Sequence, residues 1–255
     1  MERLAAGLAA AACFLVVGNA SAVRPFITDD ARVVGHGNAQ LETWARYDKG
    51  TFQHWIVPAI GPVDWLEATI GAVHGVALDP DRRYSLAAPL LQTKILFHEA
   101  RPDSSPGVAL ILGTFLPFGF GGFESPPNAF AYLAATQVIG NDDLLIHANV
   151  GIAGARMDEP ATDTPQELAK HDRIRGSWGV ATQIHLYRAA NLALEVFSGD
   201  PYAEVSGGAA QGGLRFSVTP NMQIDASAGG GVWGGDARMP FWASTGLRIV
   251  RPGVF

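Results

Sequence analysis

The chain has almost no cysteine: one residue, Cys13, in a length of 255. Cys13 lies inside an apolar, alanine-rich stretch from Leu4 to Gly18, which follows a short start containing Arg3 and precedes Asn19-Ala20-Ser21-Ala22. These parts are typical of a cleaved secretory signal, with the cut after Ala22. The run is shorter than the roughly 20 residues that cross a membrane as a helix, so a retained anchor is the weaker alternative. The mature chain would have no thiol, which excludes disulfides, cysteine-bound metals and a cysteine nucleophile.

Long apolar runs and a basic excess are also absent. After residue 22 the longest apolar candidate, Gly107 to Phe123, is broken by Pro117 and several glycines, so helical membrane spans are excluded. Acidic residues outnumber basic residues by 24 to 18, and only 16% of the chain is charged. Because a phosphate backbone is bound by a surplus of Lys and Arg, nucleic acid is not expected as a partner.

What the chain does have is a repeated run of about ten residues in which apolar and polar side chains alternate, as in the strands of membrane barrels. Leu192, Leu194 and Val196, for example, alternate with Ala193 and Glu195. Gly, Pro, Asn or Asp closes each run. Strands are predicted at residues 39–47, 52–60, 64–76, 88–99, 107–116, 128–139, 143–155, 174–187, 190–198, 207–218, 222–233 and 240–250. Their number, twelve, is even, as in bacterial single-chain barrels.

Connection lengths give an independent test of a barrel. Such barrels have short turns on the periplasmic side and longer loops outside, so with both termini in the periplasm every second connection should be short. The short class is Gly61-Pro62, Gly140-Asn141-Asp142, Arg188-Ala189 and Thr219-Pro220-Asn221. The longer, alternate connections are 77–86, 117–127 and 156–171. Residues 100–106 form a medium-length loop where a tight turn is expected, which counts against the register of the first half.

A soluble β-sandwich would alternate in the same way, with its apolar face turned into a core instead of toward lipid. The charges favour the barrel, because acids and bases occur in near-equal numbers in the middle of the polar faces, where an enclosed lumen lets them pair. These lumen candidates are Glu42, Arg46, Glu67, Lys94, Arg175, Glu195, Arg215, Asp225 and Arg248. The predicted fold is an all-β, closed, antiparallel up-and-down transmembrane β-barrel of about 12 strands over residues 39–255, preceded by a cleaved signal peptide at 1–22.

The lumen and the segment before the first strand each have two interpretations. In one, a polar path or constriction is built by three cations facing three acids: Lys94, Arg215 and Arg248 against Glu42, Glu67 and Glu195. In the other, the same charges form a structural salt-bridge ladder that fills a narrow barrel. Residues 23–38 are too polar to face lipid. They either enter the barrel as a plug or, in the preferred interpretation, lie over its periplasmic mouth.

Other chemistry has little support in the sequence. His74, His147 and His185 fall in different predicted strands without a metal-ligand spacing, so no metal or cofactor is expected. Ser177 and His185 share one polar face, but the strand between them is about 26 Å long. A Ser-His hydrolase, and hence an enzyme, is therefore not expected. An aromatic belt at the two membrane interfaces is expected from Trp65, Trp178, Trp233 and Trp242.

The residues directly after the expected cut read Arg24-Pro25-Phe26-Ile27-Thr28-Asp29-Asp30-Ala31, followed by Gly35 and Gln40-Leu41-Glu42. This N-terminus resembles that of the bacterial outer-membrane transporter family named after the phenol meta-degradation pathway. Later segments such as Gln92-Thr93-Lys94-Ile95-Leu96 and Gly213-Leu214-Arg215-Phe216 are similar to that family in outline. The resemblance implies an outer-membrane barrel with a role in the uptake of hydrophobic or aromatic compounds.

Two features depart from the pattern of such barrels. Pro252 precedes the terminal Phe255, so the last strand is expected to stop before the aromatic residue that the barrel-assembly machinery commonly reads. Pro58 lies inside the strand predicted at 52–60, which argues against a regular strand there.

Three functional hypotheses follow. The first is a narrow channel or uptake protein in the bacterial outer membrane for small apolar or aromatic solutes, with membrane lipid and the assembly machinery as its other partners. The second is a non-transporting envelope barrel whose acidic loop, Arg156 to His171, binds a partner or the cell surface. The third is a soluble periplasmic β-protein that binds a lipid-like ligand.

Overall fold

The structure is a computed structural model that describes residues 26–48, 50–78, 83–121, 128–158, 170–200, 207–234 and 239–255. The expected signal peptide, residues 1–22, and the centre of the acidic loop at 156–171 lie outside the described residues. No helix in the described part of the chain is long and apolar enough to cross a membrane.

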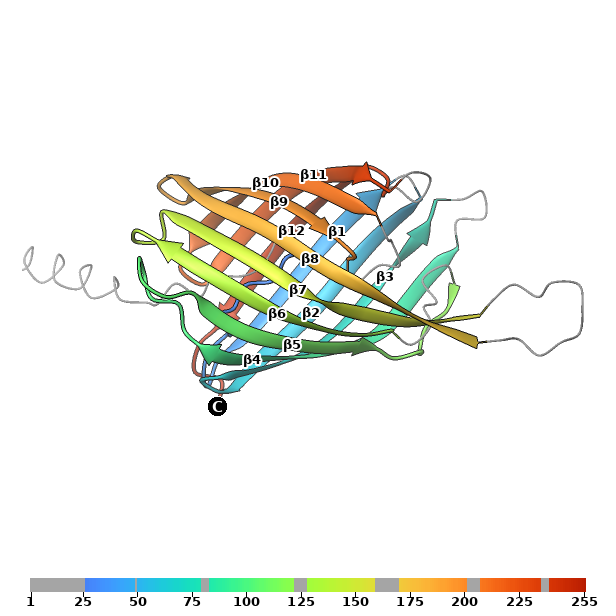
Figure 1. The fold of residues 1–255 in the computed structure, drawn as a ribbon, viewed down its shortest axis with the longest axis horizontal. Helices are drawn as coiled ribbons and strands as arrows, with labels where there is room; N and C mark the ends of the chain where they lie inside the picture. Colours follow the sequence, from blue (N-terminus) through green and yellow to red (C-terminus); the bar gives the residue numbers. More distant parts are fainter. Residues whose placement is uncertain are drawn as a thin grey trace, which may run out of the picture.

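Antiparallel strands form one closed sheet, in which every strand pairs with its neighbours in sequence and β1 pairs with β12 (Figure 1). The described strands are β1 (Ala39–Asp48), β2 (Thr51–Val63), β3 (Leu66–Ala77), β4 (Tyr84–His98), β5 (Gly107–Phe115), β6 (Asn128–Ile139), β7 (Leu144–Asp158), β8 (Lys170–Tyr187), β9 (Ala190–Ser198), β10 (Gly208–Thr219), β11 (Met222–Trp233) and β12 (Trp242–Arg251). The predicted twelve-stranded, closed, up-and-down barrel is confirmed, and each predicted strand has its counterpart.

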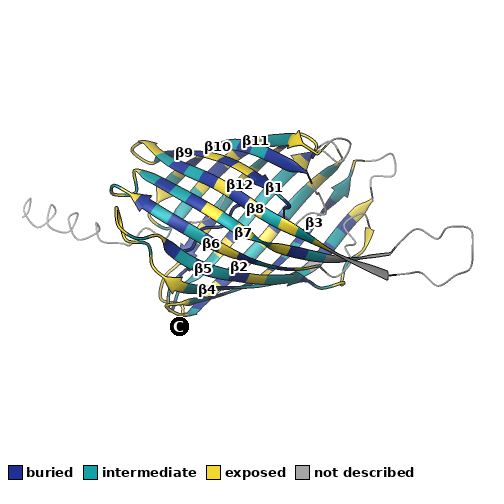
Figure 2. Cartoon of the chain, in the orientation of Figure 1, coloured by how far each residue is buried: buried dark blue, intermediate teal, exposed yellow. Residues whose placement is uncertain are grey.

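The alternation along the strands separates an apolar outer wall from a mostly polar interior. On β9 and β10 the side chains of Leu194, Leu214 and Phe216 are 46%, 40% and 41% exposed, whereas Glu195 and Arg215 between them are buried. Figure 2 shows this alternation as stripes along the strands. A closed sheet with its apolar side chains outward excludes the β-sandwich, and lipid is the solvent that suits such a wall.

The turn between β2 and β3 is shifted from its expected place. The predicted turn at Gly61-Pro62 is wrong, because β2 continues to Val63 and the turn is Asp64-Trp65. The ladder with β3 shifts between Ile60 and Val63, so Pro62, which has no N–H to donate, lies in an irregularity instead of a regular pair. Pro58 is likewise tolerated within β2, opposite Leu41 of β1.

The connection at residues 99–106 is a medium-length loop, as the sequence indicates, and the β4–β5 ladder next to it shifts in register between Leu96 and His98. The loop is held by its neighbour: the Asp103 N–H donates to the Val138 carbonyl at 3.0 Å, and the Asp103 carboxylate accepts from the Gly140 N–H at 3.0 Å. Packing on the β6–β7 turn therefore stabilises a loop longer than the strand geometry requires.

The tryptophans divide between the two sides of the wall. Trp65, Trp178 and Trp233 are 54%, 43% and 39% exposed, as expected of an interfacial belt. The expectation for Trp242 is wrong, since it is 2% exposed and points into the barrel. Space for its ring comes from Gly229 on the neighbouring strand, where a Cβ would lie 2.4 Å from Trp242 Cζ2.

The chain ends outside the ladder, as Pro252 predicts. β12 ends at Arg251, and the last residues turn toward the segment before β1, where the Val254 N–H donates to the Gly37 carbonyl at 2.7 Å. Phe255 lies edge-on to the His36 ring, with 6.4 Å between ring centroids. The terminal aromatic residue therefore packs at the mouth of the barrel and not in the last strand.

A charge on the outer wall should test its exposure to lipid. Leu214→Arg, in the middle of β10, is expected to lower the unfolding free energy in lipid vesicles by about 2–4 kcal/mol, because the cation must enter hydrocarbon. Val254→Arg, beyond the last strand, should change it little. Urea unfolding followed by tryptophan fluorescence measures both, and equal stability of the two variants would contradict a lipid-facing wall.

Candidate functional site

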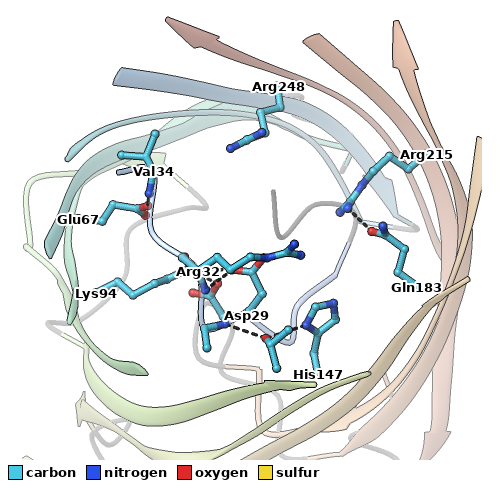
Figure 3. Close-up of polar contacts among 12 residues, drawn as sticks. Asp29, Arg32, Val34, Glu67, Lys94, His147, Gln183, Arg215 and Arg248 are labelled. Atoms are coloured by element: carbon cyan, nitrogen blue, oxygen red, sulfur yellow. Dashed lines mark hydrogen bonds and ion pairs between the residues drawn. The ribbon is translucent and has the colours of Figure 1, made fainter. Parts of the chain in front are cut away.

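The lumen is occupied by the segment that precedes β1. Phe26, Ala31 and Val34 are buried inside the barrel, and the segment leaves it at the mouth, where the Gly37 N–H donates to the Gly61 carbonyl at 2.9 Å. The expectation that this segment only covers the periplasmic mouth is wrong for residues 26–34. Its polarity, which argues against lipid, suits it to a lumen lined by charges (Figure 3).

Glu195 of β9 holds one end of this segment. Its carboxylate accepts from the Ile27 N–H at 3.0 Å, from the Thr28 N–H, and from the side-chain amide of Gln211 on β10. A buried carboxylate must collect donors of this kind, because burial without them is costly. A mid-strand acid that the sequence assigns to the lumen therefore binds backbone, and no cation lies within ion-pair distance of it among the described residues.

Lys94 of β4 holds the middle of the segment. Its Nζ lies 2.6 Å from Asp29 Oδ1 and 3.5 Å from Asp30 Oδ1, and it donates to the Arg32 carbonyl at 3.1 Å. Arg32 Nε also pairs with Asp30, at 3.1 Å. Burial alone would raise the pKa of the Asp30 carboxyl, but the charges of Arg32 and Lys94 outweigh it and lower this pKa to about 2. Asp30 is therefore anionic at neutral pH.

Polar side chains on β3, β6 and β7 fix the rest of the segment. Glu67 accepts from the Val34 N–H at 2.8 Å, and Thr136 Oγ1 accepts from the Ala31 N–H at 2.9 Å. Tyr132 donates its hydroxyl proton to Asp29 at 3.2 Å. With its amide oriented to satisfy both atoms, Asn149 accepts from the Asp29 N–H at 2.7 Å and donates to the Asp29 carbonyl at 2.9 Å. The segment is thus bound through both the N–H groups and a carbonyl group of its backbone.

Arg215, Asp225, Arg248 and Glu42 line the wall from β10 through β12 to β1, and all four are buried. Arg215 donates to Gln183 of β8, and its guanidinium lies 5.9 Å from the Phe26 ring centroid. Asp225 is opposite Arg215 in the β10–β11 register.

Arg248 donates to Gln40 at 2.9 Å and pairs with Glu42 at 3.8 Å. Of the expected cation–acid pairs across strands, this is the one within ion-pair distance among the described residues. Lys94 and Glu195 instead serve the N-terminal segment. Alternation gives the side of the sheet on which a residue lies but not its partner, so the sequence could not show this.

The two remaining lumen candidates lie apart from this network. Arg46 has its guanidinium 5.0 Å from the Trp242 ring centroid, on the inner side of β1. Arg175, near the outer end of β8, donates to the Asp200 carbonyl at 2.8 Å and so fixes the start of the β9–β10 connection. All nine candidates therefore occupy inward positions, but Arg46 and Arg175 do not contact the N-terminal segment in the described contacts.

An aromatic wall covers the inner face of β1, β2, β5 and β6, where the sequence interpretation expected polar residues. Trp44 and Trp55 stack with 5.2 Å between ring centroids, and Trp55 meets Phe115 edge-on at 6.2 Å. Phe130 and Tyr132 stack at 5.9 Å. The sequence hides this wall because strands such as 128–139 are apolar at both even and odd positions. The lumen therefore combines this aromatic wall with buried charges, including Glu67 and Lys94 on the strands between β2 and β5.

The histidines and acids of the lumen do not gather into a metal site in the part of the chain that the structure describes. The described residues contain no group of three or more His, Cys, Asp or Glu side chains that could hold a metal ion. His147, buried between the wall and the segment, bonds through Nδ1 to Thr136 Oγ1 at 3.0 Å and serves the packing of the segment.

Comparison with known proteins gives structural neighbours only. No protein-family model matches the chain, and the search of curated proteins finds no relative. An outer membrane channel from Pseudomonas putida F1 is similar with a TM-score of 0.66 and 8% identity, over 87% of this chain and 98% of that one. The fold is that of the outer-membrane β-barrels.

Two porins extend this likeness. The NanC porin has a TM-score of 0.57 and 10% identity over 83% of this chain and 98% of its own. The KdgM porin has a TM-score of 0.56 and 9% identity, covering 82% and 98%. At such identities the likeness establishes the barrel architecture, and the lumen must be interpreted from its own residues.

Removing the cation under the segment should release it. Lys94→Met leaves Asp29 and Asp30 buried with one counter-charge fewer, a loss of about 3–5 kcal/mol when a buried pair is broken on one side. Val34→Cys, placed in a mature chain that is expected to have no other thiol, reports the release as faster alkylation. Arg251→Met, at the end of β12, is the control. Equal labelling rates in all backgrounds would show that Lys94 does not hold the segment.

Proposed function

We propose that this chain is a narrow channel in the bacterial outer membrane for small apolar or aromatic solutes. The observation that carries the proposal is the aromatic wall inside the barrel, made by Trp44, Trp55, Phe115, Phe130 and Tyr132. Large aromatic side chains turned into a lumen form a surface on which a flat or apolar solute can stack in place of Ala31 of the segment, which packs there.

The outer wall and the structural neighbours support a location in the outer membrane. Apolar side chains such as Leu194 and Phe216 cover the outside of a closed sheet, which is a surface for lipid. The three similar structures named above are described as an outer membrane channel and as porins, and we propose a non-enzymatic role for this chain as well. The resemblance of the N-terminus to the phenol meta-degradation transporters supports the same class of solute.

In this function the N-terminal segment is the constriction. It crosses the lumen between Glu195 on β9 and Lys94 on β4, where Asp29 and Asp30 pair with Lys94, and Arg32 pairs with Asp30. A solute therefore passes between the segment and the aromatic wall, or passes after the segment has moved. Because each of these charges has an ionic partner, the segment holds less water than bare charges would.

A non-transporting envelope barrel is the second candidate, and the filling of the lumen favours it. Phe26, Ala31 and Val34 are buried where a wide pore would be open. The loop at 156–171, which this function would use to bind a partner, stays a prediction because its centre lies outside the described residues.

Uptake into liposomes distinguishes the two candidates. The wild-type chain is expected to admit phenyl β-glucoside faster than methyl β-glucoside, two solutes that cross a protein-free bilayer slowly, and Trp55→Gln should reduce that preference several-fold without closing the channel. Trp65→Gln, on the exposed β2–β3 turn, is the matched control. A barrel that inserts but admits neither solute, with Lys94→Met equally closed, would leave the envelope role and end the channel proposal.

A further inference from the structure

A polar cluster interrupts the lipid-facing wall of β1, β2 and β3. His54 lies on the same face of β2 as the exposed Phe52 and Ile56, opposite to the buried Trp55. His74 lies directly across from His54 in the β2–β3 register. Directly opposed side chains in an antiparallel pair have Cβ atoms about 4.5–5.5 Å apart. Two imidazoles are thus held together on a surface that is otherwise apolar.

Hydrogen bonds fix where the protons of this cluster lie. The Thr43 hydroxyl donates to the Trp55 carbonyl at 2.8 Å, so its oxygen must accept from His54 Nε2, also at 2.8 Å. A neutral His54 then has an unprotonated Nδ1, which accepts the Nε2–H of His74 at 2.9 Å. The proton on His74 Nε2 therefore lies between two ring nitrogens and points at the lone pair of His54 Nδ1.

The spacing of these nitrogens matches two ligands of one metal ion. Two nitrogens each about 2.05 Å from an ion and at right angles to each other are about 2.9 Å apart. His54 Nδ1 and His74 Nε2 are separated by 2.9 Å, which is the spacing of two neighbouring ligands at right angles on one ion. Nitrogen ligands at right angles are typical of tetragonal sites, which suit Cu²⁺ and Ni²⁺. Among divalent first-row metals, the Irving–Williams order gives Cu²⁺ the highest affinity for such ligands.

We propose that His54 and His74 form a Cu²⁺ site on the outer face of the barrel. The ion binds to one side of the line between His54 Nδ1 and His74 Nε2, and the proton of His74 moves from Nε2 to Nδ1 of the same ring, so that both imidazoles stay neutral. The other coordination positions are open to water or to headgroup oxygens. The pair lies three residues from Thr51 and Ala77, at the ends of β2 and β3 that face away from the C-terminus, so the aqueous boundary is about 10 Å away. This site is independent of the proposed channel.

The surroundings of the pair add one titratable neighbour. Tyr84, at the start of β4, has its ring centroid 5.9 Å from that of His74, and Thr43 is the neighbour on β1. Among the described side chains in contact with the pair none is a carboxylate. The charge of a bound Cu²⁺ is therefore not neutralised by the protein, and the ion attracts anionic oxygen atoms of lipid headgroups or solutes. Because protonation of either imidazole removes the lone pair that binds the ion, the Cu²⁺ affinity should fall as the pH is lowered.

The test uses the full barrel in detergent, purified without a polyhistidine tag and titrated with Cu²⁺. Quenching of tryptophan fluorescence gives the Kd, and electron paramagnetic resonance should show nitrogen couplings from imidazole. His54→Gln and His74→Gln should each raise the Kd about tenfold or more, and the double variant no further, because either ligand alone is weak. Zn²⁺ should bind more weakly than Cu²⁺.

A matched control carries His98→Gln and His185→Gln, which remove two exposed histidines at the other end of the barrel. Its Cu²⁺ affinity should equal that of the wild type. Heat-modifiable mobility on gels checks that every variant is a folded barrel. Equal Cu²⁺ affinity in the wild type and in the folded His54/His74 double variant, or a spectrum without nitrogen coupling, would overturn the proposal.

Discussion

Closure of the sheet is the constraint on which the rest of this structure depends. In hydrocarbon no water is present to satisfy backbone N–H and C=O groups, so a sheet that faces lipid must pair its last strand with its first. Here β1 and β12 pair along their whole length, from Ala39 with Arg251 to Asp48 with Trp242. Once the sheet is closed, every second side chain must enter a small interior. That requirement turns a simple alternation in the sequence into an outer wall and a lumen.

The charged side chains inside the barrel need partners, and the N-terminal segment supplies them. Mid-strand charges such as Lys94 and Glu195 are costly in an enclosed space unless each has partners. The segment supplies carboxylates to the lysine and backbone N–H groups to the glutamate. It also brings Phe26, whose ring lies 5.6 Å from that of His147. The segment and the wall are therefore complementary, because each supplies partners for the buried polar groups of the other.

The sequence predicts the fold almost completely and the site only in part. Period-two patterns depend on the backbone alone, so all the strands and the inward side of Glu42, Lys94 and Arg215 follow from them. Partners do not follow, because Asp29 and Lys94 are 65 residues apart and no local rule joins them.

The aromatic wall could not be predicted from the sequence for a different reason. In β6 the inward Phe130 and Tyr132 alternate with other apolar residues. The alternation therefore does not distinguish the inner face of this strand from its outer face. Pro62 shows a third limit, since a proline predicts a break but not whether the strand absorbs it in an irregularity.

Under the proposed function, the mixture of aromatic and charged surfaces in the lumen bears on how a charged plug is compatible with the passage of apolar solutes. The inner face of β1, β2, β5 and β6 presents Trp44, Trp55 and Phe130, whereas β10 to β12 present Arg215, Asp225 and Arg248. Bare charges would hold water, and an apolar solute would have to displace it. Pairing with the segment and with neighbouring strands removes much of that attraction for water, since each ion already has protein partners. Under the proposed function, the polar network keeps the segment in place while the aromatic side remains the surface along which the solute moves.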